Sequence, residues 1–201
     1  MIKTKTSGDG VRVAQPLFPV EGQGSIPMSP LQFRIDMVGI VEAEKLNKLW
    51  HSRLPIYKSG FCLKAKLCFA ASYRNVYFAV AIWDNPSARM LNHVTNLELK
   101  RFAISDDAPK NTASRMLKIM CSIIKKELPE IKTLISYQDV EVHRGTIYRA
   151  AGWRPVHFHK GGSWYRPNSK NQKTNTPRTR PDLNKAVGAK IRWERQIRRP
   201  L

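Results

Sequence analysis

His51, His143 and Asp139 are side chains that can bind a divalent metal. Two imidazoles and one carboxylate, with coordination positions left open, suit iron(II). If the fold gathers these residues, they form an iron(II) site. Their spacing does not establish that gathering, and a histidine near a helix end is also an ordinary cap or surface residue.

A polar segment, residues 105–114, lies between a strand-like stretch, Leu97–Ile104, and a helix-like stretch that ends at Pro129. The first turn of a helix presents unpaired N–H groups and a positive dipole end to an anion. The segment therefore predicts a site for the pyrophosphate of a cofactor, although any capped helix gives a similar pattern. The donors would be Lys110, Asn111, Thr112, Ser114 and Arg115.

A third constellation follows the strand-like stretch Thr133–Tyr137 and includes a short helical segment, Gly145–Ala151, ended by Gly152. Its sequence Ile147-Tyr148-Arg149-Ala150-Ala151-Gly152-Trp153 resembles the Leu-Tyr-x-x-x-Gly-Phe pattern of the GNAT acyltransferases. The resemblance implies that Tyr148 lies near the thiol of an acyl-CoA-type donor and acts as a general acid, as a phenol can. The segment 107–113 lacks the glycines of the GNAT phosphate loop, which disfavours ordinary use of acetyl-CoA.

Several short motifs between Leu46 and Trp153 together resemble the Mom family, phage proteins that convert adenine in DNA to an N6-carbamoylmethyl form. The matching pieces are His51-Ser52-Arg53-Leu54-Pro55, Glu98-Leu99-Lys100-Arg101, Pro109 to Arg115, and Ser136-Tyr137-Gln138-Asp139 leading through His143 to Tyr148. The resemblance implies catalytic roles for Arg101, Ser114, Asp139 and Tyr148. It also implies that Asp139 and His51 contact iron or substrate. Glu98 and Arg101 would share one face only if a β-bulge separates them.

The remaining patterns predict the elements that carry these residues. An amphipathic helix is expected over Val38–Trp50, a half-buried strand over Phe61–Phe69, and a central strand over Val76–Trp83 after a turn at residues 73–75. A closing hairpin is expected over Pro155–Pro167. The predicted fold is α/β, a GNAT-like mixed central sheet flanked by helices. It comprises a flexible segment 1–30, a catalytic domain 31–166 and a basic, disordered tail 167–201.

The formal charge is +20, and residues 31–165 contribute +10 of it while residues 166–201 contribute +9. Such a field attracts phosphate backbones, so double-stranded DNA is the expected partner, with a merely soluble basic protein or contact with anionic lipid as alternatives. Neither a membrane span nor a disulfide framework is indicated, which favours the cytoplasm. The tail residues expected to bind nucleic acid are Arg178, Arg180, Lys190, Arg192, Trp193, Arg195, Arg198 and Arg199.

The predicted function is transfer of a carbamoylmethyl-like group to the N6 amine of adenine in DNA, which protects the DNA from restriction. The donor would be an acyl-CoA-like or carbamoylmethyl compound, with iron(II) as a further cofactor. The first alternative is an acetyl-CoA-dependent N-acetyltransferase acting on RNA, a protein amine or a small molecule. The second is a basic DNA-binding accessory protein without catalysis.

Overall fold

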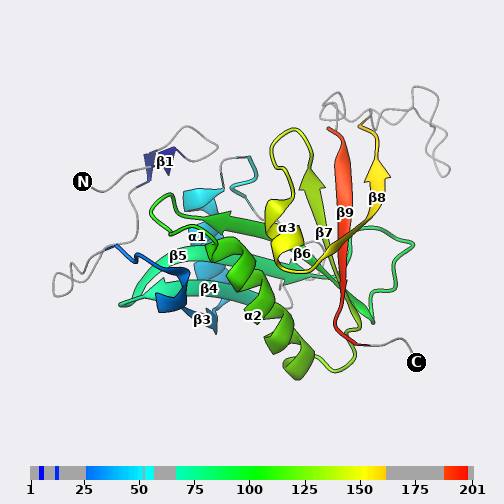
Figure 1. Ribbon diagram of the computed structural model, residues 1–201, viewed down its shortest axis with the longest axis horizontal. Coiled ribbons are helices and arrows are strands. Elements are labelled where there is room, and N and C mark those ends of the chain that lie inside the picture. Colours follow the sequence, from blue (N-terminus) through cyan, green and yellow to red (C-terminus); the bar gives the residue numbers. More distant parts are fainter. Residues whose placement is uncertain are drawn as a thin grey trace, which may run out of the picture.

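A seven-stranded mixed sheet forms the centre of the molecule (Figure 1). The computed structural model describes residues 5–6, 12–13, 26–51, 53–56, 67–161 and 188–198. Its elements are β1 (Lys5–Thr6), β2 (Arg12–Val13), a 3-10 turn (Pro30–Gln32), β3 (Arg34–Met37), α1 (Ile40–Trp50), β4 (Leu67–Tyr73), β5 (Val76–Asp84), β6 (Asn96–Ile104), α2 (Thr112–Glu127), β7 (Thr133–Asp139), α3 (Thr146–Ala150), β8 (Arg154–His159) and β9 (Lys190–Gln196).

The sheet has the strand order β3-β4-β5-β6-β7-β9-β8. All neighbouring strands are antiparallel except β6 and β7, which are parallel. A parallel pair needs a crossover connection, and α2 supplies it. The predicted α/β class with a mixed central sheet flanked by helices is therefore confirmed.

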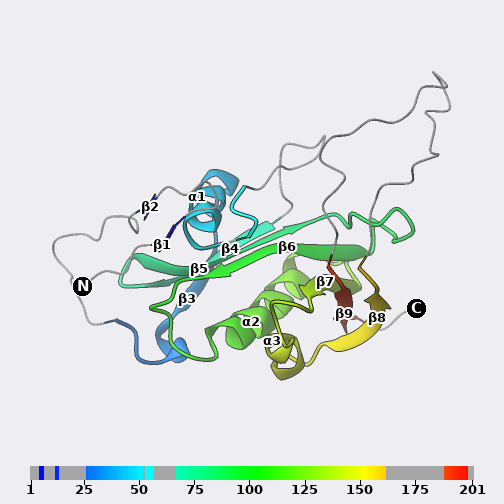
Figure 2. The ribbon, with the colours of Figure 1, turned by 90° about the horizontal axis from the view of Figure 1, so that it is seen from above.

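The two helical layers lie on opposite faces of the sheet (Figure 2). Arg74 and Asn75 both have positive φ, 49° and 62°, as the two central residues of a tight hairpin turn between β4 and β5 require. A half-buried strand was expected over Phe61–Phe69, and for residues 68 and 69 this was wrong. Residues 68–71 are buried on both faces because α1 covers one face and α2 the other, while residues 61–66 lie outside the described part.

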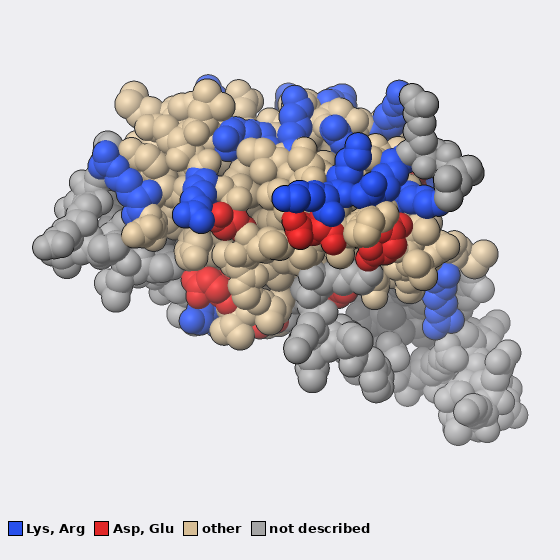
Figure 3. Space-filling model, turned by 90° about the horizontal axis from the view of Figure 1, so that it is seen from below, with Lys and Arg blue, Asp and Glu red and all other residues tan. Residues whose placement is uncertain are grey.

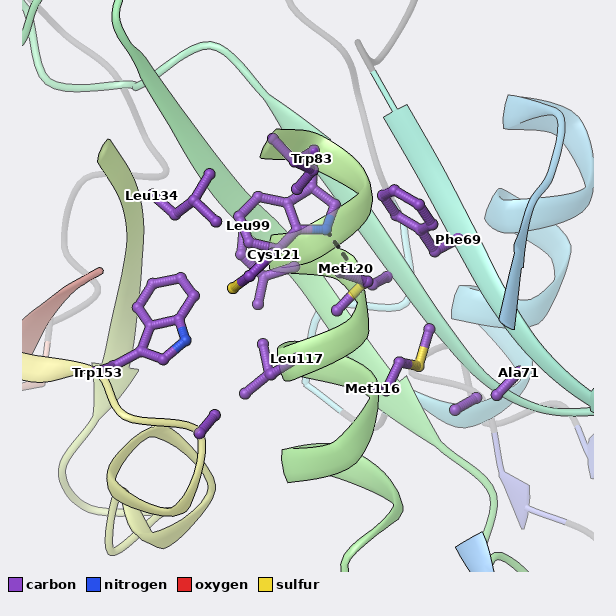
Figure 4. Close-up of a cluster of buried hydrophobic side chains, with 14 of the residues drawn as sticks. Phe69, Ala71, Trp83, Leu99, Met116, Leu117, Met120, Cys121, Leu134 and Trp153 are labelled. Atoms are coloured by element: carbon purple, nitrogen blue, oxygen red, sulfur yellow. Dashed lines mark hydrogen bonds between the residues drawn. The ribbon is translucent and has the colours of Figure 1, made fainter. Parts of the chain in front are cut away.

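The larger core lies between the sheet and α2 (Figure 4). Met116, Leu117 and Met120 of α2 are fully buried against the sheet, and the Trp83 indole N–H donates to the Met120 sulfur at 3.3 Å. Trp153 closes this core from the segment that follows α3. The smaller core contains Leu46, Leu49 and Trp50 of α1. None of the helices in the ranges given above is long and apolar enough to cross a membrane.

The C-terminal residues 188–198 are part of the sheet, so the prediction of a disordered tail over residues 167–201 was wrong for them. β9 lies between β7 and β8, and Trp193 is 1% exposed. The same pairing corrects the predicted hairpin over Pro155–Pro167, because the partner of β8 is β9. The rest of that hairpin, residues 162–167, lies outside the described part, as do Arg178, Arg180 and Arg199.

The predicted flexible segment, residues 1–30, is described only in part. β1 and β2 pair with each other in antiparallel fashion. Ser29 caps the 3-10 turn, and the Gln32 side chain accepts from the Ser29 backbone N–H in return. Residues 1–4, 7–11 and 14–25 lie outside the described ranges.

Candidate active site

A split between β6 and β7 opens the centre of the sheet. The ladder between the two strands covers Asn96–Leu99 and Thr133–Ser136, although β6 continues to Ile104 and β7 to Asp139. On its other side, β6 pairs with β5 through a bulge, because Ile82 is opposite Arg101 while the next residue, Trp83, is opposite Leu99. Bulges bend the strand that contains them, which suits the point where β6 leaves β7.

A cavity of about 580 Å³ lies in this split. Its lining comes from both faces of the sheet, from the residues after α1 and from the start of β9. The residues are His51, Arg53, Leu54, Leu99, Lys100, Phe102, Ser136, Tyr137, Gln138, Asp139, Val142, His143, Tyr148, Gly188 and Lys190. Small-molecule sites in proteins have volumes of roughly 300–1,000 Å³, so the split is large enough to hold a substrate.

Tyr148 presents its hydroxyl at the wall of the cavity. The hydroxyl lies 2.8 Å from the Ser136 Oγ, and the side chain is 7% exposed. Burial raises the pKa of Tyr148, and the hydrogen bond with Ser136 opposes that shift only in part. The phenol therefore stays protonated at neutral pH and is equipped to donate a proton or a hydrogen bond.

Trp193 packs against the Tyr148 ring inside the core. The two rings are stacked with centroids 5.3 Å apart and an interplanar angle of 16°. The Trp193 indole N–H donates to Gln138 Oε1 at 2.7 Å, and the Gln138 side-chain amide donates to the His143 carbonyl. The tryptophan predicted to stack on bases is thus a buried support, and that part of the nucleic-acid prediction was wrong.

Gly145 allows α3 to start against this support. Its φ is +70°, and a Cβ there would lie 2.5 Å from Gln138 Oε1 and 2.7 Å from Trp193 Cζ2. Only glycine combines the left-handed backbone with the close approach. Gly152, at φ +78°, adopts the left-handed conformation that the sequence predicted past the end of this helix.

Asp139 ends β7 at the cavity and is held by an ion pair. Arg53 Nη1 lies 2.7 Å from Asp139 Oδ2, and the Glu141 backbone N–H donates to Asp139 Oδ1. This pair joins the segment after α1 to the end of β7, which are 86 residues apart in the chain. The Asp139 carboxylate therefore has a fixed position beside the opening.

The three predicted metal ligands, His51, His143 and Asp139, all line the cavity. Within the described residues, however, no group of three or more His, Cys, Asp or Glu side chains is arranged to hold a metal. His51 Nδ1 accepts from the Leu54 backbone N–H at 3.2 Å, and Asp139 is paired with Arg53. The described geometry does not support the predicted iron(II) site, and no step below depends on a metal.

The bulge in β6 determines where Arg101 lies. Arg101 is opposite Ile82, which belongs to the core on the α1 side, so Glu98, Lys100 and Arg101 share that face. The Glu98 carboxylate pairs with Lys100 Nζ at 3.0 Å, and Ser87 Oγ accepts from the same ammonium at 2.6 Å. The bulge that would bring Glu98 and Arg101 to one face is thus present. Lys100 lines the cavity and Arg101 does not.

The predicted anion site at the start of α2 lies outside the cavity lining. The Thr112 hydroxyl donates to the Pro109 carbonyl and the Ser114 hydroxyl donates to the Asn111 carbonyl. Arg115 donates to the Phe33 carbonyl. Lys110 and Asn111 are exposed, and Asn111 has φ 69°.

The predicted nucleic-acid residues of the last segment divide into two groups. Lys190 and Arg192 lie on β9, where Lys190 reaches the cavity. Arg195 donates to the Ala151 carbonyl and Arg198 donates to the Lys125 carbonyl, so both side chains bind to the helical layer.

Sequence reasoning assigned no role to Ser136, Gln138, Lys100 or Arg53, although all four line the cavity. All four stood within the motifs of the family resemblance, which span residues 51–55, 98–101 and 136–139. The alternation of side chains between the two faces of a strand could have identified Ser136 and Gln138. These two residues face α3, whereas Tyr137 and Asp139 face the other side.

Comparison with known proteins gives both a family and a fold. The model of the Mom protein family matches residues 75–198. No curated protein matches the chain in sequence.

Among solved structures, the ribosomal-protein-S18-alanine N-acetyltransferase from Escherichia coli is similar with a TM-score of 0.55 and 11% identity, covering 84% of this chain and 96% of that one. A Bacillus subtilis acetyltransferase in complex with CoA gives a TM-score of 0.54 and 12% identity, covering 82% of this chain and 98% of that one. At these identities the likeness shows the acetyltransferase fold alone.

Proposed function

Because the chain belongs to the Mom protein family, we propose that it is a DNA-modification enzyme. It transfers a carbamoylmethyl-like group to the N6 amine of adenine in DNA and so protects the DNA from restriction. The observation that carries the proposal is the buried, protonated Tyr148 at the wall of a cavity in the split sheet. It is the proton donor that a transfer reaction requires at its leaving group.

The exocyclic amine of adenine is a weak nucleophile and is stacked inside the duplex. The enzyme must therefore extrude the base and hold it against an activated donor. A cavity of about 580 Å³ has room for a base and for the reactive end of a donor. The proposed acceptor site is thus the cavity mouth at the end of β7.

In the transfer step the N6 nitrogen forms a bond to the donor carbon as the bond from that carbon to its leaving group breaks. The departing group takes its electron pair and accepts the Tyr148 hydroxyl proton. The proton lost from N6 goes to the Asp139 carboxylate, which the Arg53 ion pair holds in position. Transfer of that proton through solvent to Tyr148 restores the enzyme.

The donor is proposed to be acyl-CoA-like or a carbamoylmethyl compound with an anionic portion. Lys100 lines the cavity, and its ammonium, which is already in an ion pair with Glu98, is a proposed hydrogen-bond donor to that portion. Exposed Lys110 and Asn111 before α2 are the proposed contacts for a more distant anionic group. Arg101 and Ser114 remain proposed donor contacts without a place in the cavity lining.

Expression of the protein in a bacterium, followed by mass analysis of DNA nucleosides, tests the proposal. The expected result is a deoxyadenosine derivative in which one hydrogen is replaced by a carbamoylmethyl group. Tyr148→Phe keeps the aromatic stack and removes the proton, so it should fold and lack the product. Unmodified deoxyadenosine in cells that contain soluble, folded wild-type protein would refute the proposal.

A second candidate is an acetyl-CoA-dependent N-acetyltransferase, favoured by the likeness to an acetyltransferase that was crystallised with CoA. The glycine-free segment before α2 argues against it, because close backbone approach to a pyrophosphate is harder there. Calorimetry with acetyl-CoA separates the two candidates. Binding together with release of free thiol in the presence of an amine acceptor would favour acetyl transfer.

A further inference from the structure

One face of the strands β7, β9 and β8 carries mostly polar and charged side chains. On this side of the sheet α1 packs against β4, β5 and β6, and it lies away from β9 and β8 (Figure 2). The strand register places alternate residues of the three strands on this face, which we call the open face. Its polar and charged members include Tyr137, Asp139, Lys190, Arg192, Glu194, Arg154, His157 and His159.

Contacts within the open face confirm that these side chains lie together. The His157 and His159 rings have centroids 4.2 Å apart, and His159 lies 6.1 Å from the Tyr137 ring. His157, His159 and Arg154 are exposed, and Lys190 and Arg192 are half-buried. The face therefore combines cationic side chains with rings that solvent can reach.

The electrostatic balance of the open face is positive. Its two carboxylates are in ion pairs, Glu194 with Arg192 at 3.0 Å and Asp139 with Arg53 at 2.7 Å. The pKa of His159 is lowered by desolvation and by the positive charges of His157, Arg192 and Lys190. These groups repel one another, and a polyanion placed over them would relieve that repulsion.

The open face is continuous with the cavity. Tyr137, Asp139 and Lys190 belong to both, so a nucleic-acid backbone on this face passes the cavity mouth. Backbone contacts of this kind fix the position of a duplex without reading its sequence. A base extruded from such a duplex would have a short path toward Tyr148.

A second basic surface lies at the far end of α2 and is the alternative candidate for binding DNA. There Arg198 donates to the Lys125 carbonyl, and the backbone N–H groups of Ile197 and Arg198 donate to the Lys132 carbonyl. Figure 3 shows Lys and Arg gathered on this lower side of the molecule. This surface and the cavity mouth lie at opposite ends of β7, because Lys132 precedes the strand and Asp139 ends it. The length of the strand separates them by about 20 Å.

We propose that the open face binds the phosphate backbone of duplex DNA and thereby brings the target adenine to the cavity. This inference rests on the proposed function and names the surface through which that function reaches its substrate. The surface at the end of α2 is too far from the cavity to guide an extruded base. It contributes general attraction only.

The test compares two variants that each remove two positive charges. The open-face variant is Arg154→Gln with Lys190→Gln, and the matched control is Lys125→Gln with Lys126→Gln, whose side chains are exposed at the end of α2. Binding of a fluorescent adenine-containing duplex is measured over a range of salt concentrations. Thermal unfolding establishes that both variants are folded, and Arg154→Glu alone is the reserve should the double variant be unstable.

The open-face variant should bind about tenfold more weakly than wild type at moderate salt. The slope of log K against log salt should fall by about 0.9 for each lost phosphate contact. The control should bind less than about twofold more weakly, as expected for charges without a direct phosphate contact. Equal losses in the two variants, or a larger loss in the control, would overturn the proposal. Tighter binding of single-stranded RNA of the same sequence would overturn it in favour of RNA.

The result is separable from that of the proposed function, since binding is measured without transfer. If the open face governs duplex binding while cellular deoxyadenosine stays unmodified, the surface stands and the transfer reaction fails. If wild-type protein modifies adenine and the open-face variant binds the duplex as tightly as wild type, the surface fails and the reaction stands.

Discussion

Replacing Trp193 by phenylalanine should destabilise the protein without removing any surface group. Trp193→Phe keeps an aromatic ring under Tyr148 but removes the N–H that Gln138 Oε1 accepts. Gln138 is 3% exposed, so its oxygen would be left without that donor in a buried site. An unsatisfied buried acceptor costs about 1–3 kcal/mol, and the smaller ring adds a packing loss, so we expect a loss of about 2–3 kcal/mol.

The larger change Trp193→Ala should cost about 4–5 kcal/mol, because it also removes the whole buried ring. Domains of this kind have about 5–15 kcal/mol of stability, so this variant should be close to unfolded at 37 °C. Urea unfolding followed by circular dichroism measures both values. Phe158→Ala is the control, since that ring is exposed on the adjacent strand β8 and its removal should cost under about 0.5 kcal/mol.

The reasoning would be refuted if Trp193→Phe were as stable as wild type and bound duplex DNA much more weakly. That outcome would support the prediction from the basic composition of the tail, in which Trp193 binds nucleic acid at the surface. A loss of stability with DNA affinity retained by the folded fraction is the result that a buried support requires.

Three further changes test other parts of the site. Gly145→Ala places a methyl group 2.5 Å from Gln138 Oε1 at φ +70°, so thermal unfolding should show a loss of about 2 kcal/mol or more. Arg53→Gln removes the partner of Asp139 from a half-exposed ion pair, so stability should change by under about 1 kcal/mol while nucleoside analysis shows less modified adenine. Burial raises the pKa of Cys121 from 9.0 to about 11, so the native state holds a proton that the unfolded chain loses. The unfolding free energy should therefore fall as the pH rises above 9, by about 2 kcal/mol at pH 11, and urea titrations of Cys121→Ala should lack this part of the loss.

Local patterns predicted most of the fold. β5, β6, α2, β7 and α3 lie where runs of apolar residues, a polar capping segment and Gly152 indicated them. Each of these signals is contained within one element and its flanks. β9 was missed because its neighbours in the sheet are distant in sequence, and because the arginines around Trp193 suggested a solvated tail. An alternation was nevertheless present at the start of the strand, where apolar Ile191 and Trp193 alternate with basic Lys190 and Arg192.

The candidate site was predictable where its residues belong to one continuous sequence motif. Tyr148 and Asp139 line the same cavity, as their motif implied. Arg53 could not be assigned to Asp139, because no local pattern relates residues 86 positions apart. The place of Lys100 depended on a bulge, which changes the face of every later residue in β6 and leaves no periodic signal of its own.

The position of β9 also changes how DNA binding can be examined. Removing the residues from 188 onward would take away Trp193, the support of Tyr148, together with the partner strand of both β7 and β8. Loss of activity in such a truncation would follow from loss of the fold, whether or not these residues touch DNA. The match to the family model extends to residue 198, just past this strand, as expected if β9 is integral to the domain. Side-chain substitutions on the open face, with the buried face of β9 kept intact, are therefore the changes that separate the proposed DNA contact from folding.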